Sequence, residues 1–366
     1  MDDAHRLVPC AFAAGARQPR GGEAWSVCGG GNHAFMWPQN GACLLASGSN
    51  QHGELGVDPP SGDPALEWVP VVLPGPAVRQ VACGWNHTLL LSTQGRIYAA
   101  GANGFGQLGL GPPQGSQPAA RAWTQVDVGA EPAVRRAFVA VACGLRHSLA
   151  LDEDGVVFGW GANRSGQLGL PADKRSPVVW SATRVSAGLP PIAMAACGRN
   201  HSILVAQDLR TVFVAGQDTY AQCGPGVPAP ANGAWRTFTL PRPALKLCAG
   251  WDFGAALLGP AADGRVVMWG RCDHGQLAAP PDPGARCCRE LRAAPLAGVR
   301  DLACGSNHAV AVAGDGTAHS WGWNEHGNAG DPSLADVLRP LALHGAADVV
   351  GCGYGNTWII GDPSVI

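Results

Sequence analysis

The sequence is poor in charged residues and has almost no excess of either sign. Asp, Glu, Lys and Arg make up 14% of its 366 residues, and the formal net charge is −2. Disorder needs low hydrophobicity with high net charge, whereas 46% of this chain is hydrophobic. The charge balance also disfavours a broad electrostatic surface for nucleic acid or anionic membrane. We therefore expect neither of these as a direct partner.

Long apolar runs and zinc-type cysteine pairs are missing too. No stretch reaches the roughly 18 to 20 apolar residues of a membrane span. The charged start from Met1 to Arg6 has no apolar segment behind it, unlike a secretion signal. The 13 cysteines include no Cys-x-x-Cys pair, and their number is odd. We expect a reducing compartment, cytosol or nucleus, with no metal and no cofactor.

What the chain does have is glycine, proline and a repeated pair of motifs. It contains 52 Gly and 30 Pro, typical of many short strands joined by turns. The motif Cys-Gly-x-x-His stands at 83–87, 143–147, 197–201 and 304–308, and weaker copies start at Cys28, Cys248 and Cys352. A second motif, Gly-x-Asn-x-x-Gly, starts at Gly48, Gly101, Gly161 and Gly322, and degenerate copies start at Gly216 and Gly270.

The segments between the motifs indicate strands. Turns such as Asp154-Gly155 favour tight hairpins, and the flanking runs are short and apolar. A Pro-containing loop and a fourth strand then follow, which makes four strands in about fifty residues, the pattern of a propeller blade. We predict an all-β fold: one seven-bladed β-propeller domain of four-stranded antiparallel blades over residues 1–366.

The chain ends suggest how the ring closes. The seventh copy stops after Ile360 with only two strands' worth of chain, and the segment from Val8 to Gly15 resembles a third strand. We predict that residues 5–20 and 345–366 share the seventh blade. Such closure would remove the exposed sheet edges.

The repeated cysteines and histidines are interpreted as packing residues. A small soft side chain suits a crowded centre, and each His comes from a different blade, where we expect it buried and bonded to backbone. Phe253 and Asn356 replace the His in two copies, which suits packing better than a ligand role. With no nucleophile–base pair or paired carboxylates in view, we predict that the protein is not an enzyme.

Aromatic residues in the loops mark a candidate docking side. In an up-and-down meander the first and third loops of each blade lie on one side of the ring. Trp, Tyr and Arg are frequent interface anchors. The predicted partner-binding residues are Trp85, Arg199, Trp251, Trp323, Glu325, His326 and Tyr354. The alternative is that these rings pack between blades. The Pro-containing loop 112–132, with Arg121, Arg135 and Arg136 in or near it, is a second candidate.

The two motifs together resemble the regulator-of-chromosome-condensation repeat family. His147-Ser148, Trp160-Gly161 and Gly166-Gln167-Leu168-Gly169 carry the resemblance best. Within the family, residues 320–328 with Gly353 and 356–359 are similar to the fungal branch of the alpha-tubulin suppressor, also described as an Elongator-associated killer-toxin-insensitivity factor. The chromatin-bound exchange factor for Ran typically has a basic N-terminal tail, which this start does not match.

The resemblance implies a non-enzymatic scaffold. In that branch the propeller would form a heterodimer with a small zinc-ribbon electron carrier and support diphthamide synthesis and Elongator-dependent modification of the tRNA wobble uridine, with Elongator itself as a further partner. The chain alone would be a monomer. The alternative function is a guanine-nucleotide exchange factor for Ran or another small GTPase.

Overall fold

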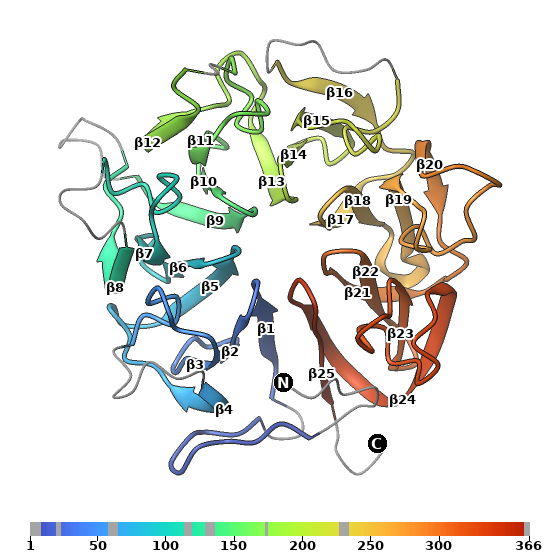
Figure 1. Cartoon of the computed structure of the whole chain (residues 1–366), viewed down its shortest axis with the longest axis horizontal. Coiled ribbons are helices and arrows are strands. Elements are labelled where there is room, and N and C mark those ends of the chain that lie inside the picture. Colours follow the sequence, from blue (N-terminus) through green and yellow to red (C-terminus); the bar gives the residue numbers. More distant parts are fainter. Residues whose placement is uncertain are drawn as a thin grey trace.

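Strands arranged around a central axis make up the described structure. The computed structural model describes residues 9–19, 23–57, 65–112, 119–128, 136–172, 175–226 and 234–361. Six antiparallel sheets stand as wedges around the axis (Figure 1). Among these residues, no helix has the length and apolar character needed to cross a membrane. The all-β propeller of mostly four-stranded blades is therefore confirmed.

The blades follow one another in chain order. The first contains β1 (Trp25–Gly29), β2 (His33–Pro38), β3 (Leu45–Gly48) and β4 (Ala65–Pro70). The second contains β5 (Val78–Cys83), β6 (His87–Ser92), β7 (Ile97–Ala102) and β8 (Ala119–Gln125). The third contains β9 (Phe138–Cys143), β10 (His147–Asp152), β11 (Val157–Ala162) and β12 (Val178–Arg184).

The second half of the chain continues this order. The fourth blade contains β13 (Ile192–Cys197), β14 (His201–Ala206), β15 (Thr211–Gly216) and β16 (Arg236–Thr239). The fifth contains β17 (Ala244–Ala249), β18 (Phe253–Leu258), a short 3-10 helix η1 (Ala261–Asp263), β19 (Arg265–Arg271) and β20 (Cys287–Ala293). The sixth contains β21 (Val299–Cys304), β22 (His308–Ala313), β23 (Thr317–Gly322), β24 (Val337–Cys352) and β25 (Thr357–Gly361).

The prediction of seven separate blades is wrong, because the described residues form six sheets. The seventh motif copy builds a strand pair from the end of β24 and β25, and β24 also pairs with β23. One 16-residue strand thus links the sixth and seventh copies into a five-stranded sheet. The chain thus passes from one copy to the next without leaving the strand.

The predicted role of the N-terminal segment is also wrong over the part that the structure describes, residues 9–19. Phe12 forms a parallel bridge with Trp68 of β4, so the segment lies against the first blade and not beside β25. Phe12 packs into a cluster that includes Trp25, Trp68 and Trp358. Burial of this aromatic ring in the seam between the first blade and β25 explains the placement. Residues 5–8, 20 and 362–366 of the predicted shared blade lie outside the described residues.

The ring nevertheless closes at its centre through all seven copies of Cys-Gly-x-x-His. Seven backbone hydrogen bonds of 2.8–3.4 Å join neighbouring loops. They run from the N–H of one loop to the carbonyl oxygen of the next: Trp85 to Leu145, Leu145 to Arg199, Arg199 to Trp251, Trp251 to Ser306, Ser306 to Tyr354, Tyr354 to Gly30, and Gly31 to Gly84. We call this the loop ring. It retains the sevenfold repeat that the sheets do not.

Side-chain bonds between blades explain why the same residue types recur. His87 Nε2 lies 3.0 Å from Ser148 Oγ of the next blade, and that hydroxyl donates to the Gln107 carbonyl oxygen. The imidazole therefore donates to the hydroxyl. Trp160 Nε1 donates to the same carbonyl at 2.9 Å. The expected burial of the repeated His is confirmed. The partner of His33, His87 and His147 is a hydroxyl of the next blade, whereas backbone was predicted, and His201 and His308 make no such hydroxyl bond among the described residues.

Candidate functional site

The first and third loops of each blade lie on one side of the ring, as predicted. The carbonyl oxygen just before each second strand accepts a hydrogen bond from the end of the third strand. Examples are Ser49 N–H to Asn32, Ala102 N–H to Asn86, and Trp323 N–H to Asn307. We call this side the motif face. The opposite side carries the Asp-Gly turns, and we call it the turn face.

Three of the predicted anchors meet above the loop ring. Trp85 and Tyr354 stack with ring centroids 5.6 Å apart, and Trp251 lies 6.0 Å from Trp85 and 5.6 Å from Tyr354. Arg199 Cζ lies 5.6 Å from the Trp251 ring. The loop ring positions these side chains because each belongs to a loop that it joins. The structure therefore brings together four of the seven predicted site residues.

These four residues are half-buried, so they serve packing as well as display. Burial raises the pKa of the Tyr354 phenol well above its usual value. The Trp251 Nε1 has no hydrogen-bond partner among the described residues, although aromatic N–H groups usually find one when buried. The cluster thus closes the centre of the ring and leaves one buried donor unsatisfied.

The other three predicted anchors lie apart, in the third loop of the sixth blade. Trp323 is half-buried and meets His326 edge-to-face at 5.2 Å, and Glu325 and His326 are exposed. Glu325, His326 and Trp323 thus present an acid, an imidazole and an indole to a partner on the motif face. It does not form one site with the central cluster through any contact that the structure shows.

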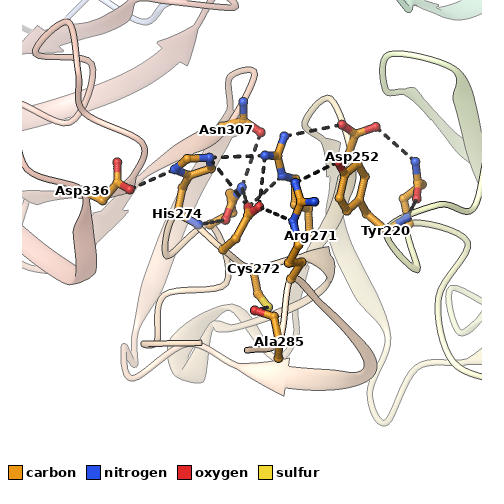
Figure 2. Close-up of polar contacts among 12 residues, drawn as sticks. Tyr220, Asp252, Arg271, Cys272, His274, Ala285, Asn307 and Asp336 are labelled. Carbon is orange, nitrogen blue, oxygen red and sulfur yellow. Dashed lines mark hydrogen bonds and ion pairs between the residues drawn. The ribbon is translucent and has the colours of Figure 1, made fainter. Parts of the chain in front are cut away.

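Sequence reasoning missed a charged network that connects the fourth, fifth and sixth blades. Its centre is Arg271 at the end of β19, whose guanidinium binds Asp273 at 2.7 and 3.1 Å and lies 4.7 Å from the Tyr220 ring (Figure 2). His274 bridges this centre to the sixth blade, since its Nδ1 lies 2.9 Å from Asp336 Oδ2. We call these residues, with Gln222, Asp252, Gln276, Arg286 and Asn307, the Arg271 network.

Two carboxylates of the network respond to it in opposite ways. Asp252 is 1% exposed and accepts a hydrogen bond from Gln222 at 3.1 Å, yet its Oδ2 has no hydrogen-bond partner. Burial therefore raises the pKa of Asp252 despite Arg199 and Arg271 nearby. Burial also acts to raise the pKa of Asp273, but its bonds to Arg271 and Gln276 outweigh this and lower it.

The sequence did contain a signal for this network. Asp252 stands where four copies of the first motif have Asn, and Arg271 stands where the second and third copies of the other motif have Ala. A charged residue in place of a neutral one in a single copy of the repeat indicates a role specific to that copy, here a polar connection between blades.

Of the second predicted candidate, the Pro-containing loop 112–132, residues 113–118 and 129–132 lie outside the described residues, as does Arg135. Of its flanks, Arg121 is exposed on β8, and Arg136 forms an ion pair of 2.9 Å with Asp152. The described part of this region therefore shows no constellation that could act on a ligand.

Metal ligation finds no site among the described residues. No group of three or more His, Cys, Asp or Glu side chains there could hold a metal ion. Burial lowers the pKa of His33, His201 and His308 to about 4, and that of His87 and His147 to about 3, so these imidazoles are neutral. Burial raises the pKa of the Cys197 thiol to about 12, which keeps it protonated.

The fold and the repeated motifs define the class of protein. Residues 4–359 match the family of RCC1-like domains, and the chain belongs to this family. It is 32% identical to the secretion-regulating guanine nucleotide exchange factor of Bos taurus, over 90% of this chain and 74% of that protein. It is 26% identical to an RCC1 repeat-containing protein of Schizosaccharomyces pombe, over 90% and 88% of the two chains.

Solved structures show the same fold. Prp20p from Saccharomyces cerevisiae superimposes with a TM-score of 0.77 at 24% identity, covering 91% of this chain and 80% of that one. The predicted repeat family is therefore confirmed. The resemblance to the alpha-tubulin suppressor branch is not shown by these relatives.

Proposed function

We propose that this protein is a guanine-nucleotide exchange factor for a small GTPase, which docks on the motif face. The observation that carries the proposal is the similarity to the secretion-regulating guanine nucleotide exchange factor of Bos taurus, which extends over 90% of this chain. The yeast Prp20p structure, described with its binding to Gsp1p, agrees with a protein partner for this fold. The Elongator-linked scaffold and its zinc-ribbon partner have no such support.

The architecture suits exchange without covalent chemistry by the propeller. A ligand shifts an equilibrium only through its differential affinity for two states. A rigid ring that binds the nucleotide-free GTPase better than the loaded form therefore promotes nucleotide release. The loop ring and the inter-blade bonds hold the motif face in one conformation, which keeps the ordering cost of binding low.

The test measures release of a fluorescent GDP analogue from a panel of purified small GTPases. We expect at least one GTPase to lose nucleotide about tenfold faster or more with the full chain, a coupling within the usual range for two ligands that oppose each other. Trp323→Ala should raise about thirtyfold the concentration of the chain that gives half of this acceleration, which is the loss of affinity expected for an anchor of about 2 kcal/mol.

The matched control is Glu153→Ala. Glu153 is exposed in an Asp-Gly turn on the turn face, so its loss should leave release unchanged. If no GTPase responds to micromolar protein, the proposed function is wrong. If Glu153→Ala weakens the effect and Trp323→Ala does not, the docking face is wrong.

A further inference from the structure

A cavity opens on the motif face where the loops of the second, third and fourth blades meet. Its volume is about 550 Å³. Three arginines line it, Arg146, Arg164 and Arg199, together with the rings of Trp85, Phe105 and Trp251. We call this cavity the arginine pocket. It shares Trp85, Trp251 and Arg199 with the central cluster and extends outward from it.

The arginines of this pocket lack acidic partners. No carboxylate of the described chain forms an ion pair with Arg146, Arg164 or Arg199, and no acidic residue lines the cavity. The positive charge of Arg199 acts to lower the pKa of Asp252, but that carboxylate is only 1% exposed. The pocket therefore concentrates positive charge in a protein whose net charge is −2.

Aromatic rings hold two of these arginines in place. Arg146 Cζ lies 4.1 Å from the Phe105 ring and Arg199 Cζ lies 5.6 Å from the Trp251 ring. A guanidinium stacked on a ring keeps its edge free for two parallel hydrogen bonds to a carboxylate. Because the like charges repel one another, an anion that enters the pocket removes an unfavourable interaction as well as forming new bonds.

The backbone of the third loops that line the pocket offers few free donors to a phosphate. Phosphates are typically bound by free backbone N–H groups of glycine-rich loops. Here the Phe105 N–H donates to Gln107 Oε1 at 2.8 Å, and the Ser165 N–H donates to Gln167 Oε1 at 2.9 Å. Side chains of the same loops thus occupy these donors. Apolar walls beside arginines instead suit a carboxylate next to an apolar side chain, as in a protein segment.

We propose that the arginine pocket binds an acidic segment of a protein partner, in which carboxylates flank an apolar side chain. The inference deepens the proposed function, on which it rests for the identity of the partner but not for the chemistry of binding. The segment would place its carboxylates on Arg146, Arg164 and Arg199 and its apolar side chain against Trp85 and Trp251.

A pair of peptides tests the chemistry without the GTPase. The probe is the blocked hexapeptide Asp-Glu-Phe-Asp-Glu-Phe, and its control is the amide counterpart Asn-Gln-Phe-Asn-Gln-Phe. Binding to the full chain is measured by calorimetry and by tryptophan fluorescence. We expect the acidic peptide to bind about tenfold tighter than the amide peptide, because charge-assisted hydrogen bonds are roughly twice as strong as neutral ones.

Variants locate the site. Arg146→Gln and Arg199→Gln should each weaken the acidic peptide about fivefold or more. The matched control is Arg184→Gln, because Arg184 is exposed on β12 of the third blade and does not line the pocket. Circular dichroism and the thermal midpoint of each variant establish that it is folded.

Three results would overturn the inference. The first is equal affinity for the two peptides, and the second is a loss with Arg184→Gln as large as that with Arg199→Gln. The third is a dimer in sedimentation that Arg146→Gln and Arg199→Gln dissociate, since a second copy would then fill the pocket. Selective peptide binding by a chain that fails to accelerate nucleotide release would refute the proposed function and leave the pocket assignment standing.

Discussion

The arginine pocket and the Arg271 network are built from the same two loops of the repeat, yet they treat arginine in opposite ways. Both stack a guanidinium on an aromatic ring, Arg199 on Trp251 and Arg271 on Tyr220. In the network the same guanidinium also binds Asp273. In the pocket no described carboxylate forms an ion pair with Arg199. An arginine in these loops can therefore either join neighbouring blades or keep its hydrogen-bond donors free for a ligand.

The difference follows from which residues share each blade boundary. Between the fifth and sixth blades, His274 Nδ1 lies 2.9 Å from Asp336 Oδ2, so a polar contact joins the two blades. Between the second and third blades, Arg146 faces Phe105, and the ring provides attraction without neutralising the charge. The network should therefore contribute to folding, whereas the pocket should contribute to binding.

Acid should produce the largest effect, because it acts on the scaffold under both regions. The repeat histidines are neutral in the folded chain, with the pKa of His87 lowered from 6.5 to about 3. The unfolded chain binds more protons below pH 6.5, so stability falls as the pH drops through this window. At pH 5 each such imidazole costs about 2 kcal/mol. We expect the urea midpoint to fall steeply between pH 6.5 and 5.

His87→Gln is the variant that checks this origin. Loss of one titrating imidazole should reduce the pH slope by about one proton, or roughly 1.4 kcal/mol per pH unit. A stability that stays flat between pH 7 and pH 5 would mean that the histidines are not buried as the structure shows. In that case acid would act on the arginine pocket and the Arg271 network separately, because it would not unfold the scaffold that carries both.

Arg271→Gln should have the next largest effect and should separate the regions. Arg271 and Asp273 are 16% and 19% exposed, so removal of the guanidinium leaves carboxylates in a partly dry site. Loss of one partner of such a pair lowers the free energy of unfolding by about 3 kcal/mol. Urea unfolding at pH 7.5 measures this. Arg286→Gln is the control, because its side chain is 64% exposed and should matter little.

Arg199→Gln should have the smallest effect on folding. Lost contact with Trp251 is offset by weaker repulsion among the pocket arginines, so the free energy of unfolding should change by less than about 0.5 kcal/mol. The same urea titration measures it. A loss as large as that of Arg271→Gln would erase the distinction between the regions, since Arg199 would then be a structural tie as well.

The sequence predicted the repeat well because its signal is multiplied. The Cys-Gly-x-x-His loops, the Asp-Gly turns and the apolar strands recur, so each copy supports the assignment of the others. The same regularity hid the exceptions. Nothing in the local pattern showed that β24 would run unbroken between two copies or that Phe12 would pair with Trp68. The predicted anchors divided into two groups for a similar reason, since only Trp85, Arg199, Trp251 and Tyr354 belong to loops that meet at the axis.

What the sequence determined alone is the type of unit, four strands with two repeated loops, because hydrogen bonding and apolar periodicity within a blade are local. Tertiary structure decided the closure of the ring, the merging of the last two copies and the neighbours of each arginine. These depend on contacts between blades far apart in the chain, such as Gln80 with Val141, which are 61 residues apart and which no local pattern contains. Whether an arginine meets an aspartate or a phenylalanine is settled only when two blades pack side by side.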